Sequence, residues 1–319
     1  MLTPALTRWL LEGSDASVRL RVLRDLLDRP RDDSDLIAAR REIGRKGWAA
    51  EILRLQLPGG QWDTPGSSRV ELYRPKYIST NWRLLVLADL GLSRKNARVA
   101  RAGELFLRRY SGPKGDLGGT GSETCFTGNA VRMLVQIGYL DDPRIRPAID
   151  WLVRSQKADG GWHCFPADAG TMDAWEALSA FAALPRGSRT PAIQRAIDRG
   201  AEFFLDRGLL KEGASTYAPW LRTHYPVHYY YDFLVGLDLL TALGYGEDRR
   251  MRPALDLLES RQNSDGSWNL DALHPDCDDP QGSDYEIEGP FYSFGLESPS
   301  RPSRWITATA LQVLSRAGR

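Results

Sequence analysis

The sequence predicts an all-α protein in which about six pairs of helices follow one another along the chain, each pair made of an outer and an inner helix. Three observations predict this fold class. A Gln-x-x-x-Gly-x-Trp motif recurs at wide intervals, weaker copies lie about halfway between, and helical patterns of apolar residues flank the copies. Repetition with such a long period is typical of proteins assembled from two-helix units.

The strong motif occurs three times, in residues 56–62, 156–162 and 262–268. The intervals between its tryptophans are 100 and 106 residues, and these tryptophans are Trp62, Trp162 and Trp268. Weaker copies near residues 105–119 and 203–213 halve the interval, so the period is about 50 residues. We expect the tryptophans to be buried in equivalent places, with the glutamine of each motif tying a nearby helix end.

Each period has the same order of elements. An amphipathic outer helix precedes the motif, as in residues 147–156, where Ile149, Leu152 and Val153 fall at helical spacing. A turn that contains glycine ends this helix. A more apolar inner helix follows, and we expect six of them, near residues 16–28, 78–91, 124–138, 172–184, 227–243 and 304–317.

The composition agrees with one large domain, which we expect to span residues 1–319. Hydrophobic residues make up 42% of the chain and charged residues 26%, which is enough for a sizeable core. A formal net charge of +1 argues against nucleic acid as the main partner. We expect no transmembrane segment, because no apolar run has the length that a bilayer requires. Three cysteines cannot form a disulfide framework, which favours the cytoplasm, and the oligomeric state stays open.

Six helix pairs can form an open solenoid or a closed ring, and the period alone does not choose between them. The motif resembles the QW repeat of squalene–hopene and oxidosqualene cyclases, and protein prenyltransferase β-subunits carry a related repeat. Segments such as 125–129 and 302–305 are also similar to a group of small bacterial toroid proteins, from which no activity carries over. The resemblance implies a closed α/α toroid, a barrel of helix pairs whose inner helices run parallel around a central cavity.

Cysteine and histidine residues occur at the predicted starts of neighbouring inner helices. A closed ring would bring these starts to one rim of the cavity, and thiolate and imidazole groups are natural zinc ligands. Protein prenyltransferases hold zinc at comparable places, with Asp-x-Cys where this chain has Glu123-Thr-Cys125. The resemblance implies a zinc site, for which we expect Cys125, Cys164, His228 and Asp173, with Glu123 and His163 as alternates. Ordinary packing roles for these residues stay equally open.

A second candidate is Asp276-Cys-Asp-Asp279, which spells the Asp-x-Asp-Asp motif of class II terpene cyclases. In those enzymes a carboxylic acid protonates an alkene or epoxide, so the candidate catalytic residues are Asp276, Asp278 and Asp279. The following residues 280–290 contain two prolines and two glycines and cannot form a helix core, which favours an ordinary acidic loop.

Aromatic residues are the third group of candidates, because aromatic faces bind prenyl chains and stabilise carbocations. We place several in first turns of inner helices and expect them to line the cavity: Trp82, Phe126, Trp175, Tyr229, Tyr231 and Trp305. Arg132 on one of these helices is a candidate for binding an anionic head group, although most such arginines are paired or solvated.

Two functions follow as hypotheses. The first is a prenyltransferase-like or terpene cyclase-like enzyme, with or without zinc, that acts on an isoprenoid or similar apolar substrate in the cavity. The second is a non-catalytic toroid, stabilised by zinc, that binds a peptide or lipid. Zinc with three protein ligands and a water would indicate catalysis, whereas four protein ligands would indicate a structural ion.

Overall fold

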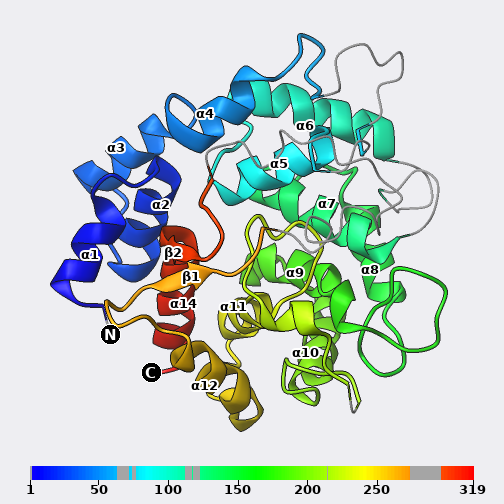
Figure 1. Cartoon of the computed structure of the whole chain (residues 1–319). Helices are drawn as coiled ribbons and strands as arrows, with labels where there is room; N and C mark the ends of the chain where they lie inside the picture. Colours follow the sequence, from blue (N-terminus) through cyan, green and yellow to red (C-terminus); the bar gives the residue numbers. More distant parts are fainter. Residues whose placement is uncertain are drawn as a thin grey trace, which may run out of the picture. The chain divides into compact units, whose positions relative to one another are not determined.

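The computed structural model describes the following residues: 2–62, 72–73, 77–111, 117, 123–213, 215–273 and 296–319. Within them the chain is mostly helical, with one short two-stranded sheet (Figure 1). A mostly helical fold is therefore confirmed, whereas the closed toroid stays a prediction. None of the described helices is long and apolar enough to cross a membrane.

The chain divides into two compact units, and neither is continuous in sequence. Unit 1 comprises residues 1–55, 218–227 and 232–319, and unit 2 comprises residues 56–217 and 228–231. Each unit contains both outer and inner helices. This division does not test whether residues 1–319 form a single domain, which stays a prediction.

Among its described residues, unit 2 contains three helices that the sequence predicts as outer and three that it predicts as inner. The outer ones are α6 (Ala97–Tyr110), α8 (Arg146–Arg154) and α10 (Pro191–Leu205). The inner ones are α5 (Thr80–Asp89), α7 (Thr124–Gln136) and α9 (Glu176–Ala183), the last preceded by the 3-10 turn η2 (Met172–Ala174). The inner helices pack side by side in chain order, α5 on α7 and α7 on α9, and a further 3-10 turn, η3 (Arg186–Ser188), precedes α10.

Unit 1 holds the two ends of the chain. Its inner helices are α2 (Ala16–Arg21), which continues as the π-helical turn η1 (Val22–Leu26), α11 (Phe233–Leu243) and α14 (Arg304–Arg316). Its other helices and turns are α1 (Pro4–Leu11), α3 (Ser34–Glu42), α4 (Gly47–Arg54), η4 (Ala218–Leu221), η5 (Arg249–Met251) and α12 (Arg252–Ser260). The last inner helix, α14, packs against the first, α2, and against α11.

The sheet of unit 1 leads into helix α14. Strand β1 (Trp268–Leu270) pairs antiparallel with β2 (Arg301–Ser303), with Trp268 opposite Ser303. The side chain of Ser303 accepts a hydrogen bond from the backbone N–H of Ile306 over 2.9 Å. This bond satisfies an N–H group of the first turn, so Ser303 both ends the strand and caps the helix.

One predicted helix begins later than expected. Residues 227–232 are not helical, and α11 starts at Phe233, after Asp232. The Asp232 carboxylate accepts a hydrogen bond from the backbone N–H of Val235 over 2.9 Å, which makes Asp232 the N-cap. The prediction that Tyr229 and Tyr231 lie in the first turn of this helix is therefore wrong. Both precede Asp232, the residue that caps the helix.

The second motif shows how each repeat turn is built. The Nε2 group of Gln156 donates hydrogen bonds to the carbonyl oxygens of Gly160 and Ala196, both over 2.8 Å. The first bond closes the turn, in which Gly160 has a φ of +91° that favours glycine. The second bond ties the turn to the outer helix α10. The indole N–H of Trp162 donates to the carbonyl oxygen of Leu152 over 2.9 Å, at the end of α8.

The other two motifs repeat this geometry. Gln56 and Gln262 donate to the carbonyl oxygen of the glycine four residues ahead, over 2.9 and 3.0 Å. Trp62, Trp162 and Trp268 are each 1% exposed. The expected burial of all three tryptophans is thus confirmed.

The repeat turns pack closely on outer helices. A Cβ atom on Gly160 would be 2.4 Å from the carbonyl oxygen of Arg199 in α10. In the third motif, a Cβ atom on Gly266 would be 3.2 Å from the side chain of Leu6 in α1. Within unit 1, the last motif of the chain therefore contacts the first helix of the chain.

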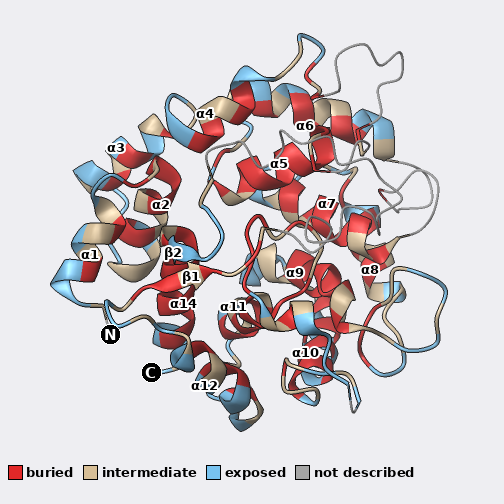
Figure 2. Cartoon of the chain, viewed as in Figure 1, coloured by how far each residue is buried: buried red, intermediate tan, exposed pale blue. Residues whose placement is uncertain are grey.

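Burial follows the distinction between inner and outer helices (Figure 2). In α5 every residue from Thr80 to Ala88 is buried, and in α14 every residue from Trp305 to Leu314. The outer helix α6 buries one face, since its polar and charged residues alternate with apolar ones at helical spacing. In α5 and α14 the apolar character seen in the sequence thus corresponds to burial on all sides.

Candidate functional site

Helices α7 and α9 of unit 2 approach so closely that only glycine fits at one contact. A Cβ atom on Gly128 would be 2.5 Å from the carbonyl carbon of Glu176 and 2.7 Å from the backbone nitrogen of Ala177. Cys125 precedes Gly128 by three residues and so lies on the same side of α7. The contact therefore places Cys125 beside Glu176, in the first turn of α9.

Glu176 is completely buried. Among the described residues, neither of its carboxyl oxygens has a hydrogen-bond partner. Burial raises the pKa of Glu176 well above its ordinary value, Cys125 and Asp173 raise it further, and the Arg132 guanidinium lowers it. Removal from water disfavours the ionised form of a carboxyl group, so these surroundings favour the protonated form of Glu176. Unit 2 therefore contains a buried carboxylic acid whose uncharged form is favoured.

Glu176 was not among the residues selected from the sequence. A signal for it was present, because Glu176 is the only charged residue in the stretch 174–185, which otherwise forms an apolar inner helix. Burying an acid costs free energy unless it is paired or protonated. An isolated acid in an inner helix therefore indicates a functional group more strongly than an acidic cluster in a polar loop.

Cys125 and Cys164 lie side by side in unit 2. The Cys125 side chain is the largest cause of a raised pKa of the Cys164 thiol, followed by burial. The Thr124 hydroxyl, next to Cys125, donates to the carbonyl oxygen of His163, next to Cys164, over 3.1 Å. This hydrogen bond between their neighbours holds the two cysteines near each other. Both cysteines are free thiols and half-buried.

The other zinc candidates do not complete a metal site. The His228 ring packs against Tyr77 and Trp82, with ring centroids 5.2 and 5.4 Å apart. The Nδ1 atom of His163 accepts a hydrogen bond from the backbone N–H of Phe165 over 3.0 Å. In the part of the chain that the structure describes, no three histidine, cysteine, aspartate or glutamate side chains are grouped so as to hold a metal ion. These residues do not fit a tetrahedral zinc site, and zinc stays a prediction.

Five aromatic side chains form a continuous group in unit 2, here called the aromatic cluster: Tyr73, Tyr77, Trp82, Phe126 and Tyr229. Ring centroids of Tyr73 lie 5.0 Å from Trp82 and 5.4 Å from Phe126, and those of Trp82 and Tyr229 are 5.5 Å apart. The hydroxyl groups of Tyr77 and Tyr229 are 3.0 Å apart. Tyr73 and Tyr229 are half-buried, so the cluster reaches accessible surface. The sequence had indicated three of the five, and Tyr73 and Tyr77 precede α5 without any periodic signal.

Trp175 and Arg132 adjoin the aromatic cluster. The Trp175 indole N–H donates to the carbonyl oxygen of Tyr229 over 3.4 Å. The Arg132 guanidinium lies 5.6 Å from the centroid of the Trp175 ring and donates to the Asp89 carboxylate over 2.8 Å. Both side chains of this ion pair are largely buried. Asp89 thus neutralises the charge of Arg132, and the Arg132 side chain is positioned to hold the Trp175 ring.

The remaining candidates lie elsewhere. The Tyr231 hydroxyl donates to the carbonyl oxygen of Leu209 over 2.9 Å, and its ring packs on Phe204. Trp305 belongs to unit 1, where its ring stacks on Tyr225 with centroids 4.2 Å apart. The candidate acids Asp276, Asp278 and Asp279 lie outside the described residues.

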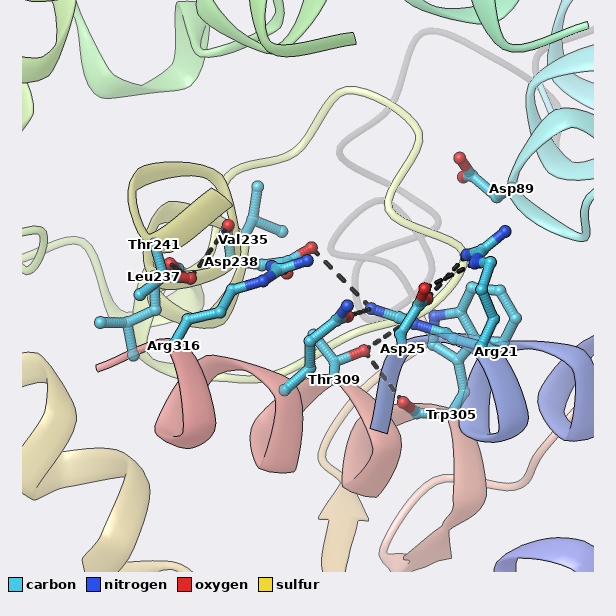
Figure 3. A network of polar contacts seen from close by, with 12 residues as sticks. Arg21, Asp25, Asp89, Val235, Leu237, Asp238, Thr241, Trp305, Thr309 and Arg316 are labelled. Carbon is cyan, nitrogen blue, oxygen red and sulfur yellow. Dashed lines mark hydrogen bonds and ion pairs between the residues drawn. The ribbon is translucent and has the colours of Figure 1, made fainter. Parts of the chain in front are cut away.

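In unit 1, Trp305 is part of a polar network that links α2, α11 and α14 (Figure 3). The Arg21 guanidinium lies 5.0 Å from the Trp305 ring centroid and donates to the Thr309 hydroxyl over 2.8 Å. The Asp238 carboxylate is 3.9 Å from Arg21 and accepts a hydrogen bond from Arg316 over 2.9 Å. Because these charges compensate one another between helices, the network holds unit 1 together.

The chain is similar to several solved structures. A protein from Actinoplanes is 22% identical, with a TM-score of 0.47 over 97% of this chain and 92% of that one. The type II terpene cyclase MstE from Scytonema is 16% identical, with a TM-score of 0.32 over 85% of this chain and 96% of that one. A polysaccharide lyase is 12% identical, with a TM-score of 0.46 over 95% and 88%. No protein-family model and no curated protein matches the chain. At TM-scores below 0.5 these likenesses assign no activity.

Proposed function

We propose that the protein is an enzyme acting on an isoprenoid or similarly apolar substrate, which binds against the aromatic cluster of unit 2 and is protonated by Glu176. The observation that carries this proposal is the state of Glu176, a completely buried acid with no hydrogen-bond partner among the described residues. Leaving a buried polar group unsatisfied costs about 1–3 kcal/mol. Such groups are concentrated at functional sites, where the cost is offset by function.

A neutral carboxylic acid can perform a reaction that a carboxylate cannot. The proton of Glu176 is transferred to one carbon of an alkene, whose π electrons form the new C–H bond. The other alkene carbon becomes a carbocation, and Glu176 becomes a carboxylate. Attack on the cation by a second alkene closes a ring, and loss of a proton from the resulting cation to a base ends the reaction. Isoprenoids contain several such alkenes in one chain.

The surroundings of Glu176 suit a cation. Trp175 directly precedes it, and the carbonyl of Tyr229 connects Trp175 to the aromatic cluster. Aromatic faces attract cations by about 0.5–2 kcal/mol each. The Arg132 guanidinium lies over the Trp175 ring and is paired with the Asp89 carboxylate, so it does not place an uncompensated positive charge beside the developing cation.

The proposal is tested with geranylgeraniol and geranylgeranyl diphosphate as probes, incubated with the protein in D2O. Protonation of an alkene introduces deuterium into the product, which mass spectrometry detects. We expect Glu176→Gln to lose this incorporation by about 10²-fold or more, the usual contribution of a general acid. Glu247→Gln, at an exposed glutamate, is the matched control and should retain it.

Binding is measured separately by quenching of tryptophan fluorescence. Glu176→Gln should bind the probes as well as the natural chain does, whereas Trp82→Leu should bind them more weakly. Phe165→Leu, at an exposed position, is the control for Trp82→Leu. Binding without any turnover would favour the alternative of a non-catalytic toroid that binds a lipid, and binding of neither probe would contradict both.

A further inference from the structure

We propose that Cys125 and Cys164 are a redox-active pair, which a low-molecular-weight disulfide converts reversibly into an intramolecular disulfide. The two residues are 39 positions apart in the sequence, and the fold alone brings them together. This inference does not depend on the proposed enzymatic function.

Contacts of neighbouring residues position Cys125 and Cys164 relative to each other. One residue before each of them, the Thr124 hydroxyl and the His163 carbonyl oxygen form a hydrogen bond of 3.1 Å, which holds the two backbones at a fixed separation. The Gly128 contact with α9 holds α7 itself in place. Two thiols held together in this way can form a bond without large movement of the chain.

The pair is also accessible to a small reagent. Both cysteines are half-buried rather than enclosed, and Phe165, which follows Cys164, is 67% exposed. The segment that carries Cys164 therefore runs at the surface of unit 2, while Cys125 lies in the first turn of α7.

The reaction proceeds by thiol–disulfide exchange with oxidised glutathione. The Cys125 thiolate attacks one sulfur of the reagent, which forms a mixed disulfide and releases one glutathione thiolate. The Cys164 thiol then loses its proton to the solvent. The Cys164 thiolate attacks the Cys125 sulfur and releases the second glutathione. Two protein thiols are thereby oxidised, and one reagent disulfide is reduced to two thiols.

Disulfide formation would change the surroundings of Glu176. Cys125 is among the groups that raise the pKa of Glu176, because it lies beside the carboxyl group. Closing the pair removes two S–H groups from this environment. Oxidation is therefore expected to shift the infrared C=O stretching band of the protonated Glu176 side chain, which Glu176→Gln would identify by removing it.

The experiment uses the full chain carrying Cys277→Ser, so that Cys125 and Cys164 are the only thiols. The reduced, chelator-treated protein is incubated with oxidised glutathione, denatured, and labelled with a maleimide. We expect no labelled thiol, no retained glutathione, and an intact mass lower by two hydrogen atoms. Peptide mapping should find the two cysteine peptides joined, and dithiothreitol should restore both thiols.

Single variants in the same background provide the controls. Cys125→Ser and Cys164→Ser each leave one thiol, which can form only a mixed disulfide or remain free. Retention of two glutathione groups by the chain with both cysteines would overturn the proposal, and so would two thiols that stay unreacted. If Cys277→Ser does not fold, as judged by circular dichroism, the peptide mapping is carried out on the natural chain.

Discussion

Gly128 of α7 lies directly against the backbone of Glu176 in α9, with no room for a Cβ atom between them. This contact is the feature from which the candidate site follows. It sets the separation of two neighbouring helices and places Cys125 beside the first turn of α9, where the Glu176 side chain is buried. The proposed roles of Glu176 and Cys125 therefore both depend on the close approach that Gly128 permits.

The Gly128 contact can be tested by adding a single methyl group. Gly128→Ala should lower the free energy of unfolding by about 1–3 kcal/mol, the usual cost of overpacking, although alanine favours helices over glycine. Gly187→Ala is the control, because a Cβ atom there would meet nothing within 4 Å. Urea unfolding of both variants checks the prediction, and equal stability of the two would show that α7 and α9 are not in this contact.

The repeat turns are tested at Trp162. Trp162→Ala should lower the free energy of unfolding by about 3–5 kcal/mol, as is usual for a buried aromatic side chain. Its ring is 1% exposed and its N–H group is bound to Leu152. Phe165→Ala, three residues away and exposed, should change stability by less than about 0.5 kcal/mol. A loss below about 1 kcal/mol for Trp162→Ala would contradict the structural role of the motif.

The glutamine of the motif is expected to matter through its two backbone partners. Gln156→Ala removes the donor to Gly160 and Ala196, so it should cost about 1–3 kcal/mol of unfolding free energy. Gln194→Ala removes an exposed amide on α10 that donates to Asp198, and it should be nearly neutral. Thermal unfolding of the two variants in parallel measures the difference, and a Gln156→Ala variant as stable as Gln194→Ala would refute this account.

Glu176 should make stability depend on pH. Because its pKa is raised in the folded state, folding favours the protonated form. The contribution to stability is present below the ordinary pKa of about 4.5 and is lost as the pH rises toward the raised value. Glutamine does not ionise, so Glu176→Gln should gain stability relative to the natural chain as the pH rises. Urea unfolding between pH 5 and pH 9 measures this trend, Glu247→Gln is the control, and parallel pH profiles would show that Glu176 is not in this environment.

Measuring the metal content distinguishes two hypotheses for Cys125 and Cys164: the zinc site that the sequence predicts, and the redox pair inferred from the structure. Zinc would be held by both thiolates and two further ligands, and its loss on chelation would lower the melting temperature. The redox pair requires no metal. We expect less than about a tenth of an equivalent of zinc, no shift in melting temperature on adding zinc, and the same result for Cys125→Ser. One equivalent of zinc that disappears in Cys125→Ser would establish the metal site instead.

Much of the fold was predictable because helix periodicity and capping are local. The predicted inner helices at 78–91, 124–138 and 304–317 agree with α5, α7 and α14 within a few residues. The start of α11 was not predicted correctly, because Tyr229 and Tyr231 extend an apolar pattern that the Asp232 cap interrupts. The apolar pattern favoured an earlier start, but the hydrogen bond from the Val235 N–H group to Asp232 fixes the start of the helix at Phe233.

The candidate site was predictable only in part. The sequence indicated Cys125, Cys164 and Trp82 from their positions near helix starts. It did not indicate that His228 packs against Tyr77 and Trp82, or that Arg132 is neutralised by Asp89. Those contacts join residues that are distant in the chain, and no spacing rule specifies them.

The sequence by itself determined the helical class, the period of about 50 residues and the burial of the motif tryptophans, since each of these depends on side chains a few positions apart. Only the tertiary structure decided the state of Glu176 and the pairing of Cys125 with Cys164. The protonation of a carboxyl group depends on how far it is removed from water and on which charges surround it. Those conditions arise where α7 meets α9, at a glycine whose importance is visible only when both helices are in place.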